Sequence, residues 1–195
     1  YNVHPWAIEI DDAIKPDAPI LHDFIKFDGK PSNIAGTLEH KKGNIEEGFK
    51  DADIIIEKEF ETAAVHQGYL ETHACLVSVS PDDRTTIWSS SQGQFMVRAM
   101  TSFITGIPQS SIRAIPAEIG GGFGGKTIVY LEPVATILSK KSGRPVKMVM
   151  TREEVMRASG PTSGSKSKVK IGAKNDGKIT AAQGTFYLQA GAFPV

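Results

Sequence analysis

Residues 120–127 of this chain read Gly120-Gly121-Gly122-Phe123-Gly124-Gly125-Lys126-Thr127. Glycine loses more backbone entropy on folding than any other residue, so five glycines around one phenylalanine indicate a special requirement. Either the torsions are ones that a Cβ would forbid, or a ligand lies against the main chain. The run follows a strand-like segment at 112–119 and precedes a helix-like segment at about 128–142. A loop in that place offers free N–H groups to an anion.

The same stretch also satisfies the pattern G-x-x-x-x-G-K-[ST] of phosphate-binding loops, through Gly120, Gly125, Lys126 and Thr127. A strand before it and a helix after it fit that reading. Against it, Phe123 places a bulky ring inside a loop that would wrap a phosphate, and no later apolar strand ends in an aspartate for Mg²⁺. A nucleotide-binding protein therefore remains an alternative on this motif alone.

Composition excludes several classes of function. The chain has 195 residues, and 22 lysines and arginines balance 22 aspartates and glutamates, which disfavours nucleic acid or a membrane surface as partner. No apolar run approaches the roughly 20 residues that span a bilayer. Cys75 is the only cysteine, so neither an intrachain disulfide nor a cysteine-rich iron–sulfur or zinc site is expected, and the predicted compartment is the cytoplasm. The chain opens without methionine and stops after an apolar stretch, so we expect a piece of a longer polypeptide.

The order of predicted elements favours an α+β fold with a mixed sheet. Residues 1–43, rich in proline, aspartate and lysine, predict an extended linker arm, and Asn44 is the expected N-cap of a short helix ending near Lys50. Asn175-Asp176-Gly177 predicts the turn of a hairpin. The other predicted strands are 54–63, 74–80, 85–91, 112–119 and 146–151, and the other predicted helices are 94–105, about 128–142 and 153–157.

Apolar periodicity predicts which helix faces are buried. The residues predicted to face the core from helix 94–105 are Phe95, Met96, Ala99, Met100, Phe103 and Ile104. Those predicted for the second helix are Leu131, Val134, Ala135 and Leu138. Gly106 and Gly143 are the expected helix ends.

Two further segments carry polar side chains that could serve a site. His66, Glu71 and His73 have the residue types of a metal site, although the favoured interpretation is a hydrogen-bonded scaffold. Ser91 and Gln92 lie between a predicted strand and a predicted helix, where side chains meet a ligand or cap the helix.

Together, Glu71-Thr72-His73-Ala74, Ser91-Gln92 and Gly120 to Lys126 resemble, in this order and at these intervals, the molybdenum hydroxylases. That is the family of xanthine dehydrogenase, aldehyde oxidase, aerobic carbon monoxide dehydrogenase and nicotinate dehydrogenase. The resemblance covers nearly the whole chain and overrides the phosphate-loop reading. It extends through 15–23, 131–135, 143–147, 176–179 and 190–192.

The resemblance implies a molybdopterin cofactor whose molybdenum takes no ligand from the protein. Gln92 would direct its amide at an oxygen ligand of the metal, and Phe123 and Gly124 would pass their backbone beside it. Gly121, Gly122 and Gly125 would let the chain approach. Residues 1–43 would then be a linker from a preceding domain, and 44–195 the N-terminal part of the cofactor-binding domain.

The implied chemistry is hydroxylation of a heteroaromatic or aldehyde-type small molecule with oxygen derived from water. The family places the catalytic base, a glutamate, far beyond the glycine run, so no catalytic residue is expected within this chain. Iron–sulfur clusters and FAD are implied on other domains or subunits, within an oligomer. Lys126 would be structural. Thr127 stands where purine-oxidising members often carry a glutamate, which disfavours a purine substrate.

Overall fold

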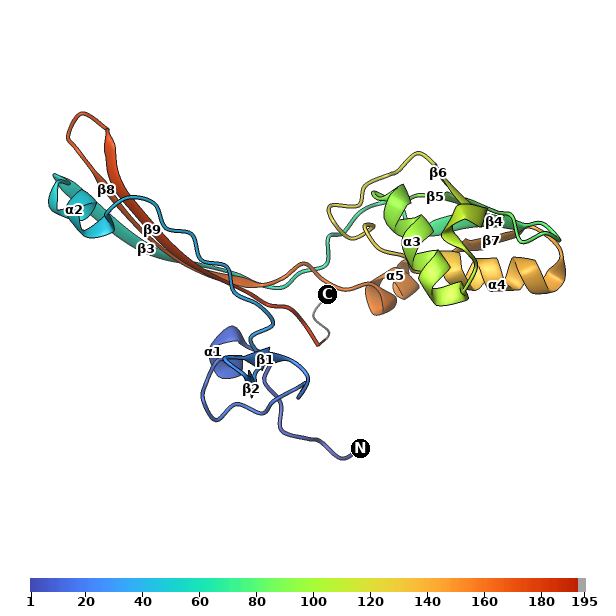
Figure 1. The fold of residues 1–195 in the computed structure, drawn as a ribbon, viewed down its shortest axis with the longest axis horizontal. Coiled ribbons are helices and arrows are strands. Elements are labelled where there is room, and N and C mark those ends of the chain that lie inside the picture. Colours follow the sequence, from blue (N-terminus) through green and yellow to red (C-terminus); the bar gives the residue numbers. More distant parts are fainter. Residues whose placement is uncertain (193–195) are drawn as a thin grey trace. The chain divides into compact units, whose positions relative to one another are not determined.

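The computed structural model describes residues 1–192, and the chain forms two units (Figure 1). Unit 2 is the continuous segment Val65–Thr162, whereas unit 1 combines Tyr1–Ala64 with the residues from Ser163 onward. The chain thus leaves unit 1 once and returns to it. This division does not coincide with the expected boundary at residues 43 and 44, which stays a prediction. Within residues 1–192, no helix is long and apolar enough to cross a membrane.

Unit 2 is built on a mixed four-stranded sheet, which confirms the predicted α+β class. Its strands lie in the order β6-β5-β4-β7, and β5 and β6 are parallel while the other pairs are antiparallel. The strands are β4 (Ala74–Val79), β5 (Thr85–Ser89), β6 (Ile112–Pro116) and β7 (Val146–Val149).

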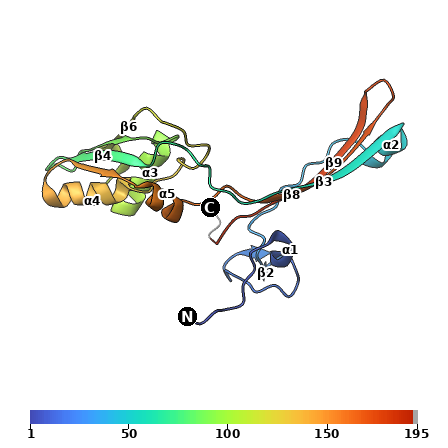
Figure 2. The same ribbon diagram turned by 180° about the vertical axis from the view of Figure 1, so that it is seen from behind.

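Helices α3 (Gln94–Thr105) and α4 (Glu132–Ser142) pack on one face of this sheet, as Figures 1 and 2 show. The core between them includes Val77, Ile87 and Val97, none of which has exposed surface. Gly106 and Gly143 end the two helices in the left-handed conformation, as predicted. The unit is completed by a 3₁₀ turn, η1 (Gln109–Ser111), and by α5 (Arg152–Ala158).

The predicted core faces of these two helices are wrong in part. In α3, Val97 and Thr101 are buried, whereas the side chains of Phe95 and Phe103 are 87% and 83% exposed. The helix packs on α4 and β6, and its buried residues are the smaller Val97 and Thr101. In α4, Ala135 is buried as predicted, but the other buried positions of the helix are Glu132, Pro133, Thr136 and Ser139, while Val134 and Leu138 are exposed.

Unit 1 contains a three-stranded antiparallel sheet in the order β3-β8-β9. The hairpin turn of residues 175–177 joins β8 to β9, as predicted. Asn44 caps α2 by accepting hydrogen bonds from two backbone N–H groups. Gly48 and Gly172 let α2 lie against the hairpin, since a Cβ on either would collide with it or with the helix. The elements are α1 (Ile10–Ala13), β1 (Lys26–Phe27), β2 (Lys30–Pro31), α2 (Ile45–Lys50), β3 (Ile54–Thr62), β8 (Ser165–Ala173) and β9 (Ile179–Leu188).

The two faces of the unit 1 sheet differ in chemistry. Strand register places Lys166, Lys168 and Lys170 of β8 on one face, where they pair with the glutamates of β3. The opposite face is mainly apolar, with Lys58, Thr62, Ser165 and Ser167 also on it. Its apolar residues are Ile54, Ile56, Phe60, Val169, Ile171, Ala182, Phe186 and Leu188. Most of these apolar side chains are exposed, and none of the described residues buries this face.

Candidate functional site

The parallel pairing of β5 and β6 brings together the two most informative sequence segments of unit 2. Ser89 at the end of β5 pairs with Pro116 at the end of β6, so both strands stop at the same edge of the sheet. Gln92 follows β5, and the glycine loop, defined as Gly120–Gly125, follows β6. Parallel strands present their carboxyl ends together, which is where open sheets of this kind bind ligands.

Gln92 holds the far end of the glycine loop through its side chain and backbone. Its Oε1 accepts hydrogen bonds from the N–H groups of Gly124 at 3.0 Å and Lys126 at 3.2 Å. Its own N–H donates to the carbonyl oxygen of Lys126 at 2.9 Å, and Ser91 Oγ donates to the same oxygen. The two N–H donors fix the orientation of the Gln92 amide, because the atom that they face must be the oxygen and the NH2 group cannot accept a hydrogen bond. Nε2 therefore points away from those donors and has no hydrogen bond to a described residue.

Three of the glycines make room for side chains of the chain itself. A Cβ on Gly122 would lie 2.5 Å from Gln92 Oε1, and one on Gly120 would lie 2.7 Å from Glu71 Cβ. A Cβ on Gly125 would lie 2.7 Å from Tyr69 Cε1. The expectation from sequence was that missing Cβ atoms admit a ligand. At these positions the structure supplies a different reason, which is the close packing of the loop on its own supports.

The other loop residues have unusual torsions. Gly121 and Gly124 have φ of +97° and +88°, and Phe123 between them has φ of +48°, which non-glycine residues rarely adopt. The Phe123 side chain is 73% exposed. The N–H groups of Gly121, Gly122 and Phe123 make no hydrogen bond to a described residue. Successive free N–H groups in a turn of this kind attract anionic oxygen.

The candidate site is thus a set of hydrogen-bond donors. It consists of Gln92 Nε2 and the backbone N–H groups of Gly121, Gly122 and Phe123. The other predicted residues, Gly124 and Gly125, lie in the same loop with their N–H groups bound to Gln92 Oε1 and to the carbonyl oxygen of Gly122. Such a set fits a group that is rich in oxygen acceptors, such as the oxygen ligands of a molybdenum centre. The donors available here therefore fit the molybdopterin cofactor that the sequence resemblance implies.

Lys126 does not serve as a phosphate-binding lysine. Its side chain is 1% exposed, and Nζ lies 2.6 Å from Glu71 Oε2. Helix α4 begins only at Glu132, and Thr127 Oγ1 donates to the carbonyl oxygen of Gly124 instead of facing a ligand. A phosphate-binding loop needs a free lysine and a helix that begins directly after it. The geometry therefore argues against a nucleotide site.

The histidines form part of a scaffold beneath the loop. Tyr69 Oη hydrogen-bonds His73 Nε2 at 2.7 Å, and His66 Nε2 hydrogen-bonds Ser159 Oγ at 2.9 Å. Burial lowers the pKa of His73, and the positive charge of Lys126 lowers it further. No group of three potential metal ligands comes together among residues 1–192.

Glu132 was missed as a functional position by sequence reasoning. It is a buried carboxylate that accepts hydrogen bonds from Ser89 Oγ, at the end of β5, and from the N–H of Tyr130 at 3.0 Å. It therefore ties the strand that leads to Gln92 to the start of α4. The signals were its place in the resembling stretch 131–135 and its position directly before a proline at a helix start, where acids are common because of the helix dipole alone.

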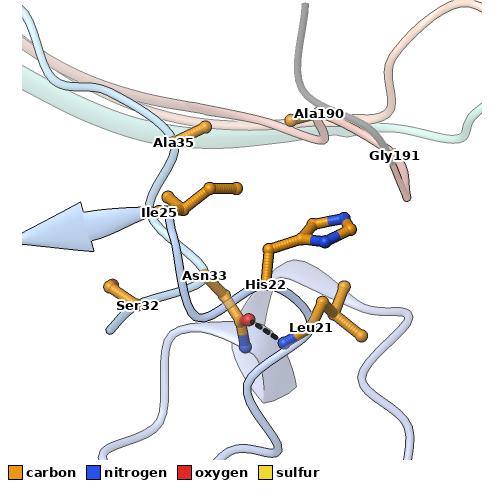
Figure 3. Close-up of a pocket in the computed structure, with 8 residues that line it drawn as sticks. All are labelled: Leu21, His22, Ile25, Ser32, Asn33, Ala35, Ala190 and Gly191. Carbon is orange, nitrogen blue, oxygen red and sulfur yellow. Dashed lines mark hydrogen bonds between the residues drawn. The ribbon is translucent and has the colours of Figure 1, made fainter.

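A separate small pocket lies in unit 1, and Figure 3 shows its lining. The N–H of Leu21 donates to Asn33 Oδ1 at 3.1 Å in this pocket. None of the predicted site residues lines it. The lining residues are Leu21, His22, Ile25, Ser32, Asn33, Ala35, Ala190 and Gly191.

Comparison with known families confirms the resemblance seen in the sequence. Residues 26–195 match the molybdopterin cofactor-binding domain. The chain belongs to this family. Relatives include the probable hypoxanthine oxidase XdhD of Escherichia coli K12, 30% identical over 99% of this chain and 23% of the relative. The carbon monoxide dehydrogenase large chain of Hydrogenophaga pseudoflava is 32% identical over 99% of this chain and 25% of the relative.

Solved structures show the same fold. Carbon monoxide dehydrogenase from Oligotropha carboxidovorans superposes with a TM-score of 0.72 at 28% identity, and the match covers 95% of this chain and 24% of that one. The chain thus spans about a quarter of the length of the relatives it matches.

Proposed function

We propose that this chain supplies the first part of the molybdopterin-binding region of an oxidoreductase. One observation carries the proposal. Gln92 Oε1 is occupied by two loop N–H groups, so that Nε2 is left to donate to a ligand beside the free N–H groups of the glycine loop. The residues that would donate to the cofactor are Gln92, Gly121, Gly122 and Phe123. Gly124 and Gly125 would shape the loop beside it, because their own N–H groups are bound to Gln92 Oε1 and to the carbonyl oxygen of Gly122.

The bound cofactor would supply a molybdenum centre that inserts oxygen derived from water into a small substrate. This chain's residues would bind and orient that centre through donated hydrogen bonds, without a direct metal ligand. None of them is placed to act as the catalytic base, because the site's groups are amides, which do not take up protons at ordinary pH. The base is proposed to be a glutamate beyond this chain.

The proposed substrate is a heteroaromatic compound or an aldehyde. Support comes from the names of relatives, which include a probable hypoxanthine oxidase and aldehyde oxidase 3 of the mouse. Thr127 follows the loop and its hydroxyl is bound to the carbonyl oxygen of Gly124. Hypoxanthine is a purine, so the name of that relative and the neutral Thr127 indicate different substrates. On the strength of Thr127 we propose a substrate other than a purine.

We further propose that iron–sulfur clusters and FAD on other domains or subunits accept the electrons. A single buried cysteine cannot hold a cluster that needs several thiolates. The proposed setting is a cytoplasmic oligomer, where a lone thiol stays reduced.

The test is the metal and pterin content of the full-length protein, purified from a host that makes the cofactor. We expect molybdenum and pterin in the wild-type protein. Gln92→Glu keeps an oxygen for the two loop N–H groups but removes the outward donor, so it should lose most of the molybdenum. Gln109→Ala, on an exposed residue outside the site, is the matched control. Wild-type protein that contains neither molybdenum nor pterin would contradict the proposal.

A further inference from the structure

A single carboxylate joins the two ends of the glycine loop. Glu71 Oε2 accepts the N–H of Gly120 at 2.9 Å, at the start of the loop. The same oxygen accepts Lys126 Nζ at 2.6 Å, directly after the loop. The backbone N–H of Glu71 also donates to the carbonyl oxygen of Gly120 at 3.2 Å. Gly120 and Lys126 flank the free N–H groups of Gly121, Gly122 and Phe123, and both are therefore held by the Glu71 carboxylate.

The lysine of this ion pair is enclosed in protein. Nζ lies 5.0 Å from the centre of the Tyr69 ring and 3.3 Å from the carbonyl oxygen of Thr72, which accepts a hydrogen bond from it. Burial of an ammonium group is unfavourable unless an anion compensates it. Glu71 is the carboxylate that does so. Burial alone would raise the pKa of Glu71, but the hydrogen bonds from Lys126 and Gly120 outweigh it and hold that pKa below its ordinary value.

The backbone of Lys126 is tied as firmly as its side chain. Its N–H and its carbonyl oxygen are bound to Gln92, the residue whose Nε2 belongs to the donor set. A shift of Lys126 would therefore move the loop and release one of the two N–H groups that orient the Gln92 amide. The ion pair and the donor set are mechanically linked through one residue.

We propose that Glu71 and Lys126 are positioning residues that hold the glycine loop and the Gln92 amide in the arrangement that receives the cofactor. This inference rests on the proposed function, and it assigns to the pair a role that goes beyond stabilising the fold. Neither side chain contacts the ligand. Both act through the backbone of the loop and through Gln92.

The experiment separates stability from loop geometry by means of a double variant. Glu71→Gln and Lys126→Met each leave one charge without its partner, whereas the Glu71→Gln/Lys126→Met protein has no unpaired charge. The matched control is Asp83→Asn/Lys140→Met, which removes an exposed ion pair of the same unit. Three quantities are measured on the full-length protein: the thermal midpoint, amide hydrogen exchange in residues 120–127, and molybdenum content.

We expect both single variants to lower the midpoint and to speed exchange in the loop. The double variant should regain much of the midpoint, because no buried charge remains uncompensated. Its loop should still exchange about tenfold faster than in the wild type, since local opening does not follow global stability. Its molybdenum content should stay low. The control pair should change none of the three quantities.

Two outcomes would overturn the inference. One is a double variant in which loop exchange and molybdenum content recover together with the midpoint, since the pair would then serve stability alone. The other is Glu71→Gln protein with wild-type loop exchange. If instead the wild-type protein holds no molybdenum while the variants still loosen the loop, the proposed function fails and the control of the loop by this ion pair stands.

Discussion

The two units of the chain bury their apolar residues very differently. In unit 2, the side chains of Val77, Ile87 and Val97 are completely enclosed between the sheet and two helices. In unit 1, every residue of β3 is exposed, and Ile56 and Phe60 are 57% and 60% exposed. Each sheet has an apolar face, but only in unit 2 do helices cover one. Leu76 and Trp88 stay partly exposed on the other face of that sheet.

This difference shows that the residue pattern of a strand predicts which face of a sheet is apolar, but it does not predict whether another element covers that face. A sheet of three strands needs a packed face to be stable independently. Unit 2 provides its own cover, whereas unit 1 has α2 against part of its charged face and none of the described residues over its apolar face. We therefore expect the stability of this chain to reside in unit 2, where the candidate site also lies.

The largest expected effect is a core truncation that compares one isoleucine in each unit. Ile87→Ala should lower the free energy of unfolding by about 3–4 kcal/mol, because the side chain is fully buried. Ile56→Ala should lower it by less than about 1 kcal/mol, as at other exposed positions. Denaturant unfolding of the full-length protein measures both. An equal loss from the two variants would show that the apolar face of unit 1 is covered in the full-length protein.

The next comparison is between ion pairs. Glu71→Ala leaves the enclosed ammonium of Lys126 without its partner, and we expect a loss of about 3 kcal/mol, at the lower end for buried pairs because Glu71 is partly exposed. Glu57→Ala, in the exposed ladder with Lys168, should change stability little, because solvent screens such pairs. Unfolding at low and high salt distinguishes them. A strong salt dependence of the Glu71 effect would contradict the burial of its partner.

A pH series tests the histidine of unit 2. The pKa of His73 is lowered by burial and by Lys126, so the unfolded chain binds a proton before the folded one does. Stability should therefore fall as the pH drops below about 6.5, the ordinary histidine pKa, and level off below the folded-state pKa. His73→Gln should remove this component, whereas His40→Gln in unit 1 is the control. The lowered pKa of Glu71 should cause a further loss of folding stability in more acidic solution, as the carboxylate takes up a proton.

The smallest expected effects concern helix caps. Thr151 and Glu154 form a capping box on α5, and Asn44 caps α2, so replacing Thr151 or Asn44 with alanine should cost about 1 kcal/mol of helix stability. Val155 of α5 is buried in unit 2, whereas no residue of α2 is buried. The Thr151→Ala loss should therefore appear in global unfolding. The Asn44→Ala loss should appear only as faster amide exchange in α2.

Sequence patterns predicted most of the elements, because glycines and prolines mark their ends. The α3 helix has the predicted bounds, and Gln92 and the glycine loop meet as expected. The α4 helix begins later than predicted, at Glu132, because Lys126 is bound to Glu71 and Gln92 and the Tyr130 ring packs on His73 before the helix starts. The correctly predicted elements contain strong local signals, such as glycines at helix ends, and a sequence shows local signals directly.

The helix faces could not be predicted, because small polar residues replace large apolar ones in the core of unit 2. Ser139 Oγ accepts the N–H of Val79 and donates to the carbonyl oxygen of Arg144, so its hydroxyl is satisfied inside the protein. Thr136 donates to the carbonyl oxygen of Glu132 in the same way. Periodicity ranks such residues as solvent-facing. Their hydroxyls are satisfied by partners both near in sequence, as Glu132 is to Thr136, and distant, as Val79 is to Ser139, and periodicity takes account of neither.

The fixed orientation of the Gln92 amide also bears on how the site would respond to its surroundings. Neither a carboxamide nor a peptide N–H gains or loses a proton while a protein remains folded. The surface that faces the ligand would keep one polarity in acidic and in alkaline solution alike. Any acidity profile of the assembled enzyme would then report on other groups, and this part of the pocket would act as a constant electrostatic background.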